Sequence, residues 1–276
     1  MDDSTAREQH DVIDLELDRP HSARMYDYFL GGVTNFPADR EAAARAIAAF
    51  PSTLIAARSN RAFMRRSTRC LAQLGIEQFL DIGTGIPTSP NLHEVAQSVV
   101  PRARVVYTDN DPIVLTHARA LLRSRPEGAT AYMHADVTDP AGLLAHHVLR
   151  GTLDFHRPIA LSLNALLHFV TDEHHDAHGI VESLKAALPS GSALVVSHAT
   201  PDFDPEAIAR VTAIYRAAGT PVQARTREEI ARFFTGWELL DPGLRPILRW
   251  RPDPEEAHLT FTDAEAACYA GVARKP

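Results

Sequence analysis

The sequence predicts an α/β fold, with a mostly parallel sheet covered by helices on both faces and preceded by a helical cap. One observation is the segment 79–82, apolar except for the acid Asp81, which leads directly into two alternating glycines. Another is the alternation of short apolar runs with amphipathic segments after that point, which is typical of a parallel sheet. The 276 residues, 45% of them hydrophobic, suffice for one full core. We therefore predict a flexible leader and helical cap over residues 1–75 and the main domain over 76–276.

Composition restricts the partners and the compartment. A formal net charge of -7 gives no support for broad binding to nucleic acid. Cys70 and Cys268 are the only cysteines and form no metal-binding spacing, so we expect a reducing, cytoplasmic setting and no metal site. The sequence has no apolar signal segment and no run long enough to cross a bilayer, which predicts no membrane association.

The N-terminal region should be a charged leader, residues 1–20, followed by three helices. Ser22 can cap the first of them, and Gly31 with Gly32 can end it. Pro37 can start the second. The three helices are expected over residues 22–30, 37–50 and 53–74.

Beyond residue 76, strands and helices should alternate along the chain. Strands are predicted at residues 79–82, 105–109, 131–134, 159–163, 193–197, 237–250 and 268–273, the sixth interrupted at Pro242. Helices are predicted to start at Asn91, at Asp111 with Pro112, near Thr171, at Asp204 with Pro205, and at Arg225.

The glycine loop favours a cationic ligand. Gly83 and Gly85, with Thr84 between them, let the backbone turn sharply and approach a ligand closely. A dinucleotide-binding loop would need a small third residue where Thr88 stands, and Asp81 would repel a pyrophosphate. A nicotinamide dehydrogenase is therefore disfavoured. S-adenosylmethionine, with its ammonium and sulfonium groups, suits Asp81 better.

Two further acids stand after predicted strands. Asp109, next to Asn110, can accept both hydroxyls of a ribose, because Asp111 is the better cap for the helix that follows. Asp136, next to Val137, can accept an adenine amino group, although a turn role is the alternative.

Several motifs resemble those of class I S-adenosylmethionine-dependent methyltransferases. They are residues 79–85, Asp109, and residues 135–137. Residues 23–32, 60–63, 91–96 and 197–200 resemble, more narrowly, an actinobacterial methyltransferase family whose substrates are largely unassigned. The resemblance implies a seven-stranded Rossmann-like methyltransferase sheet with one antiparallel strand at the edge, and S-adenosylmethionine as cofactor. Pro87 departs from the usual third glycine.

His168 is the best candidate for a catalytic base. Methyl transfer needs positioning of the acceptor and a base where the acceptor is protonated, and His168 follows the fourth predicted strand. A packed, hydrogen-bonded histidine is the alternative. Asn164 is expected to line the methionine end of the cofactor.

The cap contributes the predicted acceptor site. Tyr26, Tyr28, Asn35 and Phe36 combine apolar bodies with polar tips around two glycines, so they can form a lid over the cofactor and shape the acceptor pocket. Core packing is the alternative for the aromatic members of this set.

The third helix carries an arginine row. We expect Arg65, Arg66 and Arg69 to be solvated, whereas Arg58 or Arg61 can turn inward to a carboxylate, which makes Arg61 a cofactor-binding candidate.

His174 and His178 have a spacing that can bind a metal, but a solvated helix start is the simpler interpretation.

The sequence thus predicts a methyltransferase that acts on a small molecule. The alternative is a regulatory protein that binds S-adenosylmethionine or S-adenosylhomocysteine without turnover. Neither the acceptor nor the oligomeric state follows from the sequence.

Overall fold

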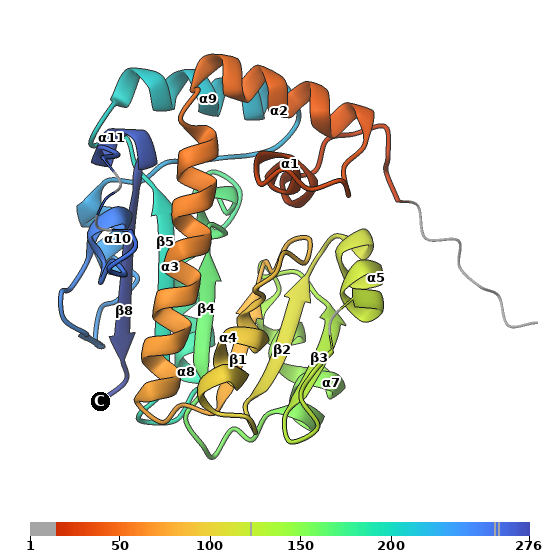
Figure 1. Ribbon diagram of the computed structural model, residues 1–276, viewed down its shortest axis with the longest axis vertical. Helices are drawn as coiled ribbons and strands as arrows, with labels where there is room; N and C mark the ends of the chain where they lie inside the picture. The colour runs from red at the N-terminus through yellow and green to blue at the C-terminus, as the bar shows by residue number, and fades with distance from the viewer. Residues whose placement is uncertain (1–14, 122, 257, 259) are drawn as a thin grey trace, which may run out of the picture.

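The computed structural model describes residues 15–121, 123–256, 258 and 260–276. Its centre is a mixed sheet in the order β3-β2-β1-β4-β5-β8-β6, with β7 beside β8 (Figure 1). The strands are β1 (Gln78–Ile82), β2 (Arg104–Asp109), β3 (Ala129–His134), β4 (Ala160–Asn164), β5 (Ala193–Ala199), β6 (Glu238–Leu239), β7 (Arg245–Pro246) and β8 (Cys268–Arg274). The predicted α/β class is confirmed.

The antiparallel strand is internal, which differs from the expectation. β8 runs antiparallel to β5 and also pairs with β6 and β7, so the short β6 forms that edge of the sheet. With β6 and β7 counted, the described sheet has eight strands where seven were expected.

Helices cover both faces. They are α1 (Ser22–Phe29), α2 (Pro37–Ala49), α3 (Thr53–Gln73), α4 (Leu92–Val99), α5 (Pro112–Leu121), α6 (Pro140–Ala145), α7 (His147–Thr152), α8 (Ala177–Ala186), α9 (Pro205–Ala217), α10 (Arg227–Arg232) and α11 (Asp263–Ala266), with the 3-10 turns η1 (Leu167–Phe169) and η2 (Ile247–Arg249). The three predicted N-terminal helices are confirmed. The short helices α6 and α7 were not predicted. None of the helices in the described ranges is long and apolar enough to span a bilayer.

Alternation along the strands builds two separate cores. In β1, Phe79 packs with Phe63 of α3 and Leu92 of α4. Its neighbour Leu80 belongs to the opposite core, together with Ile180 of α8. This period of two places one apolar face on each side of the sheet, as a parallel sheet between two helical layers requires.

The sixth predicted strand, over residues 237–250, is wrong except for the short β6 and β7. Arg66 of α3 explains part of the difference, because its guanidinium donates to the carbonyl oxygens of Trp250 (2.9 Å) and Ile247 (2.8 Å). Backbone acceptors in this segment are therefore satisfied by a side chain rather than by a strand ladder. Arg66 is only 5% exposed and pairs with Glu256, so its predicted solvated position is also wrong. Arg65 and Arg69 are partly exposed and pair with Glu256 and Asp253, which follow this segment.

Two helix starts differ from the predictions. The helix predicted from Thr171 begins at Ala177, because Asp176 caps it by accepting from the Gly179 backbone N–H (2.9 Å). At α1, His21 takes the capping role expected of Ser22, since its Nδ1 accepts from the Ala23 N–H (3.3 Å). In both helices, the side chain that accepts from a free backbone N–H of the first turn determines the residue at which the helix begins.

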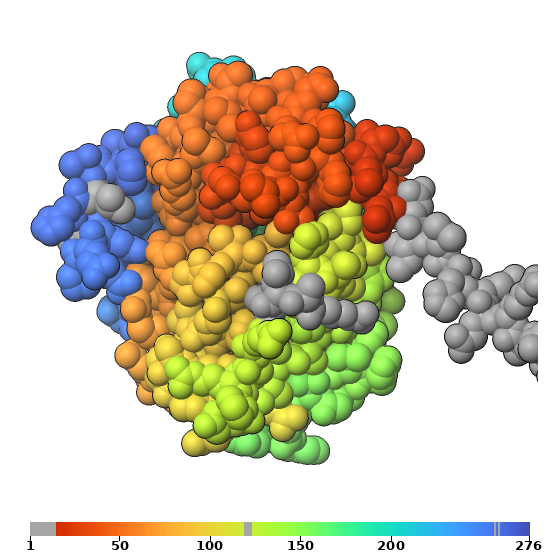
Figure 2. Space-filling view, turned by 45° about the vertical axis from the view of Figure 1, so that its right-hand side comes forward, coloured from red at the N-terminus to blue at the C-terminus, as the bar shows by residue number. Residues whose placement is uncertain are grey.

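A helical roof lies over the carboxyl ends of the parallel strands. It consists of α1, α2 and α9, with the upper part of α3 descending from it along the sheet (Figure 1). Met25 and Phe29 of α1 share one apolar cluster with Val211 and Tyr215 of α9, so the roof joins the N-terminal cap to a helix of the main domain. Figure 2 shows the N-terminal helices, in red and orange, directly above the yellow and green first half of the sheet. Residues 1–14 of the predicted leader lie outside the described part.

Candidate active site

A cavity of about 230 Å³ lies where the strands meet the roof. Most of the predicted site residues line it, namely Tyr26, Arg61, Asp81, Gly83, Thr84, Gly85, Asp109, Asn110, Asn164 and His168. Tyr28, Asn35, Phe36, Asp136 and Val137 lie outside its lining. Chain segments far apart in sequence thus converge on one site at the carboxyl ends of β1, β2 and β4, the edge where ligands bind in open α/β sheets.

The two loop glycines have different structural roles. Both adopt positive φ angles, +73° at Gly83 and +67° at Gly85, a region that favours glycine. A Cβ on Gly83 would lie 2.6 Å from Cδ1 of Leu166, whereas a Cβ on Gly85 would meet no atom within 4 Å. Gly83 therefore allows close packing against Leu166, and Gly85 leaves space open on the cavity side.

Asp109 is held firmly at the end of β2. Its Oδ2 accepts from the Gly85 N–H (2.8 Å) and its Oδ1 from the Asp111 N–H (3.0 Å). Burial raises the pKa of Asp109, and the two N–H groups oppose that rise. Asp111 instead accepts from the Ile113 N–H (2.8 Å) at the start of α5, as the sequence indicated. The Asp109 carboxylate is thus fixed beside the glycine loop.

A second acidic group joins β1 to β4. Asp81 and Ser162 are register partners on adjacent strands, and Ser162 hydrogen-bonds the Asp81 carboxylate. Ser162 Oγ also accepts from Asn164 Nδ2 (2.6 Å). Burial raises the pKa of Asp81 to about 6, although Ser162 and the Arg61 charge act in the other direction. Asn164 Oδ1 is closed to solvent and has no partner in the described chain, so it is a free acceptor at this end of the cavity.

Arg61 of α3 lines the cavity while holding the loop that follows the glycines. It donates to the carbonyl oxygens of Thr88 and Pro90, the latter at 2.8 Å. Arg58, the other inward candidate, is exposed. Arg61 therefore couples α3 to the loop and keeps a positive charge near Asp81.

His168 lies in η1, just after β4, and is partly buried. Burial, with a contribution from the Arg225 charge, lowers the pKa of His168 to about 4, so its imidazole is neutral at pH 7. Its Nδ1 has no partner among the residues described. An imidazole with so low a pKa is a weak base, because efficient general bases have pKa values near the operating pH.

A hydrogen-bonded chain that sequence reasoning missed connects the roof to β5. Asn60 Nδ2 donates to Tyr26 Oη (2.9 Å), Ser197 Oγ donates to Asn60 Oδ1 (2.5 Å), and the Ala165 N–H donates to Ser197 Oγ (2.9 Å). Asn60 is 7% exposed and Ser197 is 1% exposed. Both residues lie in segments on which the family resemblance rests. Asn60 could also have been recognised as a site residue because it is a polar residue on an otherwise apolar helix face.

The three cap residues outside the cavity lining support the roof. Asn35 Nδ2 donates to Asp27 Oδ2 (2.8 Å). The Phe36 ring lies 5.7 Å from the Arg24 guanidinium, and Tyr28 packs against the α1–α2 cluster. They are placed to fix the shape of the roof.

The third predicted acid and its neighbour lie beyond the cavity edge. Asp136 Oδ2 accepts from Asn110 Nδ2 (3.1 Å), and Asn110 does line the cavity. Val137 is buried in the core next to α6 and α7. Asp136 therefore lies behind the cavity wall and contacts it through Asn110.

The histidine pair has other contacts. His174 Nδ1 lies 2.9 Å from Thr171 Oγ1, and the His178 ring stacks on Phe233. In the part of the chain that the structure describes, no group of three histidine, cysteine or acidic side chains is arranged to hold a metal ion.

Comparison with known proteins identifies the family. The sequence profile of a family described as S-adenosyl methyltransferase matches residues 7–276. The chain belongs to this family. This methyltransferase is similar to a DUF574 family protein from Streptomyces avermitilis, with 50% identity, coverage of 95% of this chain and 100% of that chain, and a TM-score of 0.92. It is also similar to a candidate methyltransferase from Thermobifida fusca, with 41% identity, 95% and 97% coverage, and a TM-score of 0.86. No curated protein matches.

The family resemblance predicted from the sequence is thereby confirmed, and the cofactor is S-adenosylmethionine. The methyltransferase cavity suits this cofactor on its own chemistry. The missing Cβ of Gly85 leaves room, and Asp109 presents a fixed carboxylate next to it. Asp81 and the free Oδ1 of Asn164 add acceptors that a cationic ligand would use.

Proposed function

We propose that this methyltransferase acts on a small molecule bound inside the roofed cavity. The observation that carries the proposal is that the cavity of about 230 Å³ is lined both by the glycine loop and by residues of α3 and α9, many of them apolar. When bound, S-adenosylmethionine supplies an electrophilic methyl group on a sulfonium sulfur. The protein then has to position the acceptor and exclude water, and a cavity beneath the helical roof favours both.

A labelling experiment tests this function. The protein is incubated with methyl-labelled S-adenosylmethionine and a heat-treated actinobacterial extract that has been separated into small molecules, proteins and nucleic acids. We expect label only in the small-molecule fraction. Label transferred to the protein or nucleic-acid fraction would show that the acceptor is a macromolecule.

Within this function we assign the cavity residues to parts of the cofactor. Asp109 accepts the ribose hydroxyls, with Asn110 and the loop residues Gly83, Thr84 and Gly85 around them. Asp81 and Asn164 receive the ammonium group, and Arg61 serves the carboxylate. Asp136 and Val137 lie on the side assigned to the adenine. Tyr26 and His168 face the acceptor, and Tyr28, Asn35 and Phe36 shape that site from behind.

Substitution of Asp109 by alanine should weaken S-adenosylmethionine binding without unfolding the protein. The change removes a charged acceptor and also leaves the Gly85 N–H without its partner. We expect a loss of about 1.5–3 kcal/mol. Calorimetry on Asp109→Ala and on the isosteric Asp109→Asn measures it, with Glu127→Ala in an exposed turn as the control. Wild-type affinity in a folded Asp109→Ala protein would remove the ribose assignment.

Cofactor affinity should fall as the pH is lowered through the pKa of Asp81. Burial places that pKa at about 6, so the carboxylate is mostly ionised at pH 7 and mostly protonated at pH 5. Only the ionised form attracts an ammonium group, which stays protonated over this range. We expect about a tenfold loss of affinity from pH 7 to pH 5. Calorimetry at both pH values on Asp81→Asn provides the control, because that variant should show a flat profile. An equally steep profile in Asp81→Asn would assign the pH dependence to another group.

A further inference from the structure

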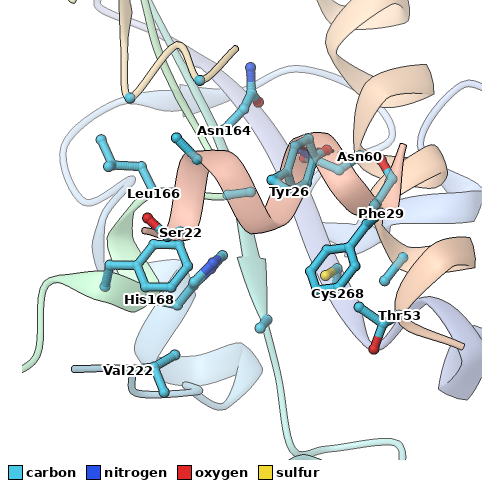
Figure 3. Close-up of a pocket in the computed structure, with 18 of the residues that line it drawn as sticks. Ser22, Tyr26, Phe29, Thr53, Asn60, Asn164, Leu166, His168, Val222 and Cys268 are labelled. Carbon is cyan, nitrogen blue, oxygen red and sulfur yellow. Dashed lines mark hydrogen bonds between the residues drawn. The ribbon is translucent and has the colours of Figure 1, made fainter. Parts of the chain in front are cut away.

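The cavity has a second compartment beyond the cofactor residues. We call it the acceptor chamber and define it as the part of the lining contributed by Phe29, residues 50–57, residues 208–224 and residues 266–268. Phe29, Phe50 and Tyr215 supply rings to its wall, and Ala56, Ile208 and Val211 supply aliphatic surface. Figure 3 shows Phe29, Thr53 and Cys268 on one side of the cavity and His168 and Val222 on the other.

The acceptor chamber carries no formal charge. Among the described residues that line it, none is lysine, arginine, aspartate or glutamate. The charged groups of the cavity, Arg61, Asp81 and Asp109, belong to the cofactor compartment. Burial raises the pKa of the Cys268 thiol to about 12 and also raises the pKa of the Tyr215 hydroxyl, so both side chains stay neutral at physiological pH.

Two hydroxyl groups of the chamber wall, those of Thr53 and Thr212, already have partners. Thr53 Oγ1 donates to the Phe50 carbonyl (2.6 Å), and Thr212 Oγ1 donates to the Ala209 carbonyl (3.0 Å). A charged group placed here would lose its hydration and find no opposite charge, which is costly, whereas an apolar ring would pack against the aromatic wall at no such cost.

Several hydrogen-bonding side chains lie at the junction of the two compartments. Asn60 and Tyr26 are joined there by a hydrogen bond of 2.9 Å, and His168 and Asn164 also line the cavity. A molecule that fills the chamber can therefore present one polar group toward the cofactor compartment and keep the rest of its surface on apolar side chains.

We propose that the methyl acceptor is an uncharged, largely apolar ring compound, whose apolar body fills the acceptor chamber and whose single polar group faces the junction. This inference rests on the proposed function, since the chamber is assigned to the acceptor. It adds the chemical class of the substrate and makes the charge of the ligand the property to test.

Calorimetry with two probes that share one naphthalene ring system tests the inference. In the presence of saturating S-adenosylhomocysteine, 2-naphthol, which is neutral at pH 7, should bind at least ten times more tightly than the anion 2-naphthoate. Equal or tighter binding of 2-naphthoate, or no binding of 2-naphthol with or without S-adenosylhomocysteine, would overturn the proposal.

Variants locate the probe. Ala56→Phe places a ring in the chamber and should weaken 2-naphthol binding at least tenfold while the affinity for S-adenosylhomocysteine stays within twofold. Ala48→Phe adds the same ring on the exposed side of α2 and should change neither affinity. Thr212→Phe fills the chamber from α9 and replaces Ala56→Phe if that protein does not fold. If either of these variants folds and binds 2-naphthol as tightly as the wild type, 2-naphthol does not bind in the acceptor chamber.

The two proposals can fail separately. If S-adenosylhomocysteine binds and, of the two probes, only 2-naphthoate binds with it, the proposed substrate class is wrong, whereas the proposed cofactor site is supported. If 2-naphthol binds in the chamber and label from S-adenosylmethionine goes to a macromolecule, the small-molecule function is wrong and the apolar chamber has another ligand.

Discussion

Replacement of Gly85 by valine is expected to abolish binding of S-adenosylmethionine. At a φ of +67°, no atom lies within 4 Å of the position where a Cβ would be, so a valine side chain would occupy open space at the loop that lines the cavity. A β-branched residue is also strained at positive φ and would tend to open the turn. Either effect removes the space for the cofactor, and calorimetry should detect no binding.

Gly75 provides the matched control for this substitution. Its φ is +88° and its Cβ position is equally open, but it follows α3 at the other end of β1, away from the cavity. Gly75→Val should therefore show a similar loss of thermal stability and normal cofactor binding. If Gly85→Val binds S-adenosylmethionine normally, the loop is not the cofactor site, and if both variants lose binding, backbone strain is the cause.

Local signals were enough to predict the centre of the fold. The largely apolar strand β1 carries Asp81 next to its last residue, and β2 ends in Asp109. The glycines after β1 specify a turn without help from distant residues. The Asn91 start of α4 was equally local, because Asn91 and Glu94 form a capping box within one turn. Such features depend on neighbours in sequence, so one sequence reveals them.

Contacts between distant segments were not predictable in the same way. Arg66 looked like one member of a solvated row, but its partner Glu256 is 190 residues away. The position of α9 in the roof is another case, since the start at Asp204 and Pro205 indicated a helix without indicating which surface it covers. The acceptor chamber depends on this placement, so its apolar character became visible only with the fold.

Polar residues in apolar surroundings were the weak point of the site prediction. Asn60 and Ser197 form the chain that ties the roof to β5, yet each has a common structural explanation in isolation. Asn35 was predicted to line the site of the methyl acceptor, but its side-chain amide donates to Asp27 within the roof. A polar residue that lines the cavity differs from one that supports the fold only in the direction of its side chain. Sequence periodicity indicates which face of a helix or strand a residue lies on, but not which residue it contacts.

Arg225 holds the loop that carries His168. It is 1% exposed and donates to the carbonyl oxygens of Leu167 and Val170 (both 2.9 Å) and to the Asp172 carboxylate (2.6 Å). Its Nη1 also lies 3.0 Å from His198 Nε2, which fixes the loop against the end of β5. One planar guanidinium thus donates to two carbonyl oxygens and one carboxylate around the loop.

Arg225→Met should therefore cause the largest loss of stability among the substitutions considered. The change removes a donor to the Val170 carbonyl, one of the donors to the Leu167 carbonyl, and the charged partner of the half-exposed Asp172. We expect the free energy of unfolding to fall by about 2–4 kcal/mol, because hydrogen bonds at a buried position are lost without full replacement by water. Arg225→Lys keeps the charge but not the planar fork, so it should lose less. Urea denaturation measures both, with Arg104→Met at the exposed start of β2 expected to stay within about 0.5 kcal/mol of the wild type. A loss below about 1 kcal/mol in Arg225→Met would mean that water replaces the guanidinium, and the loop would then owe its position to packing alone.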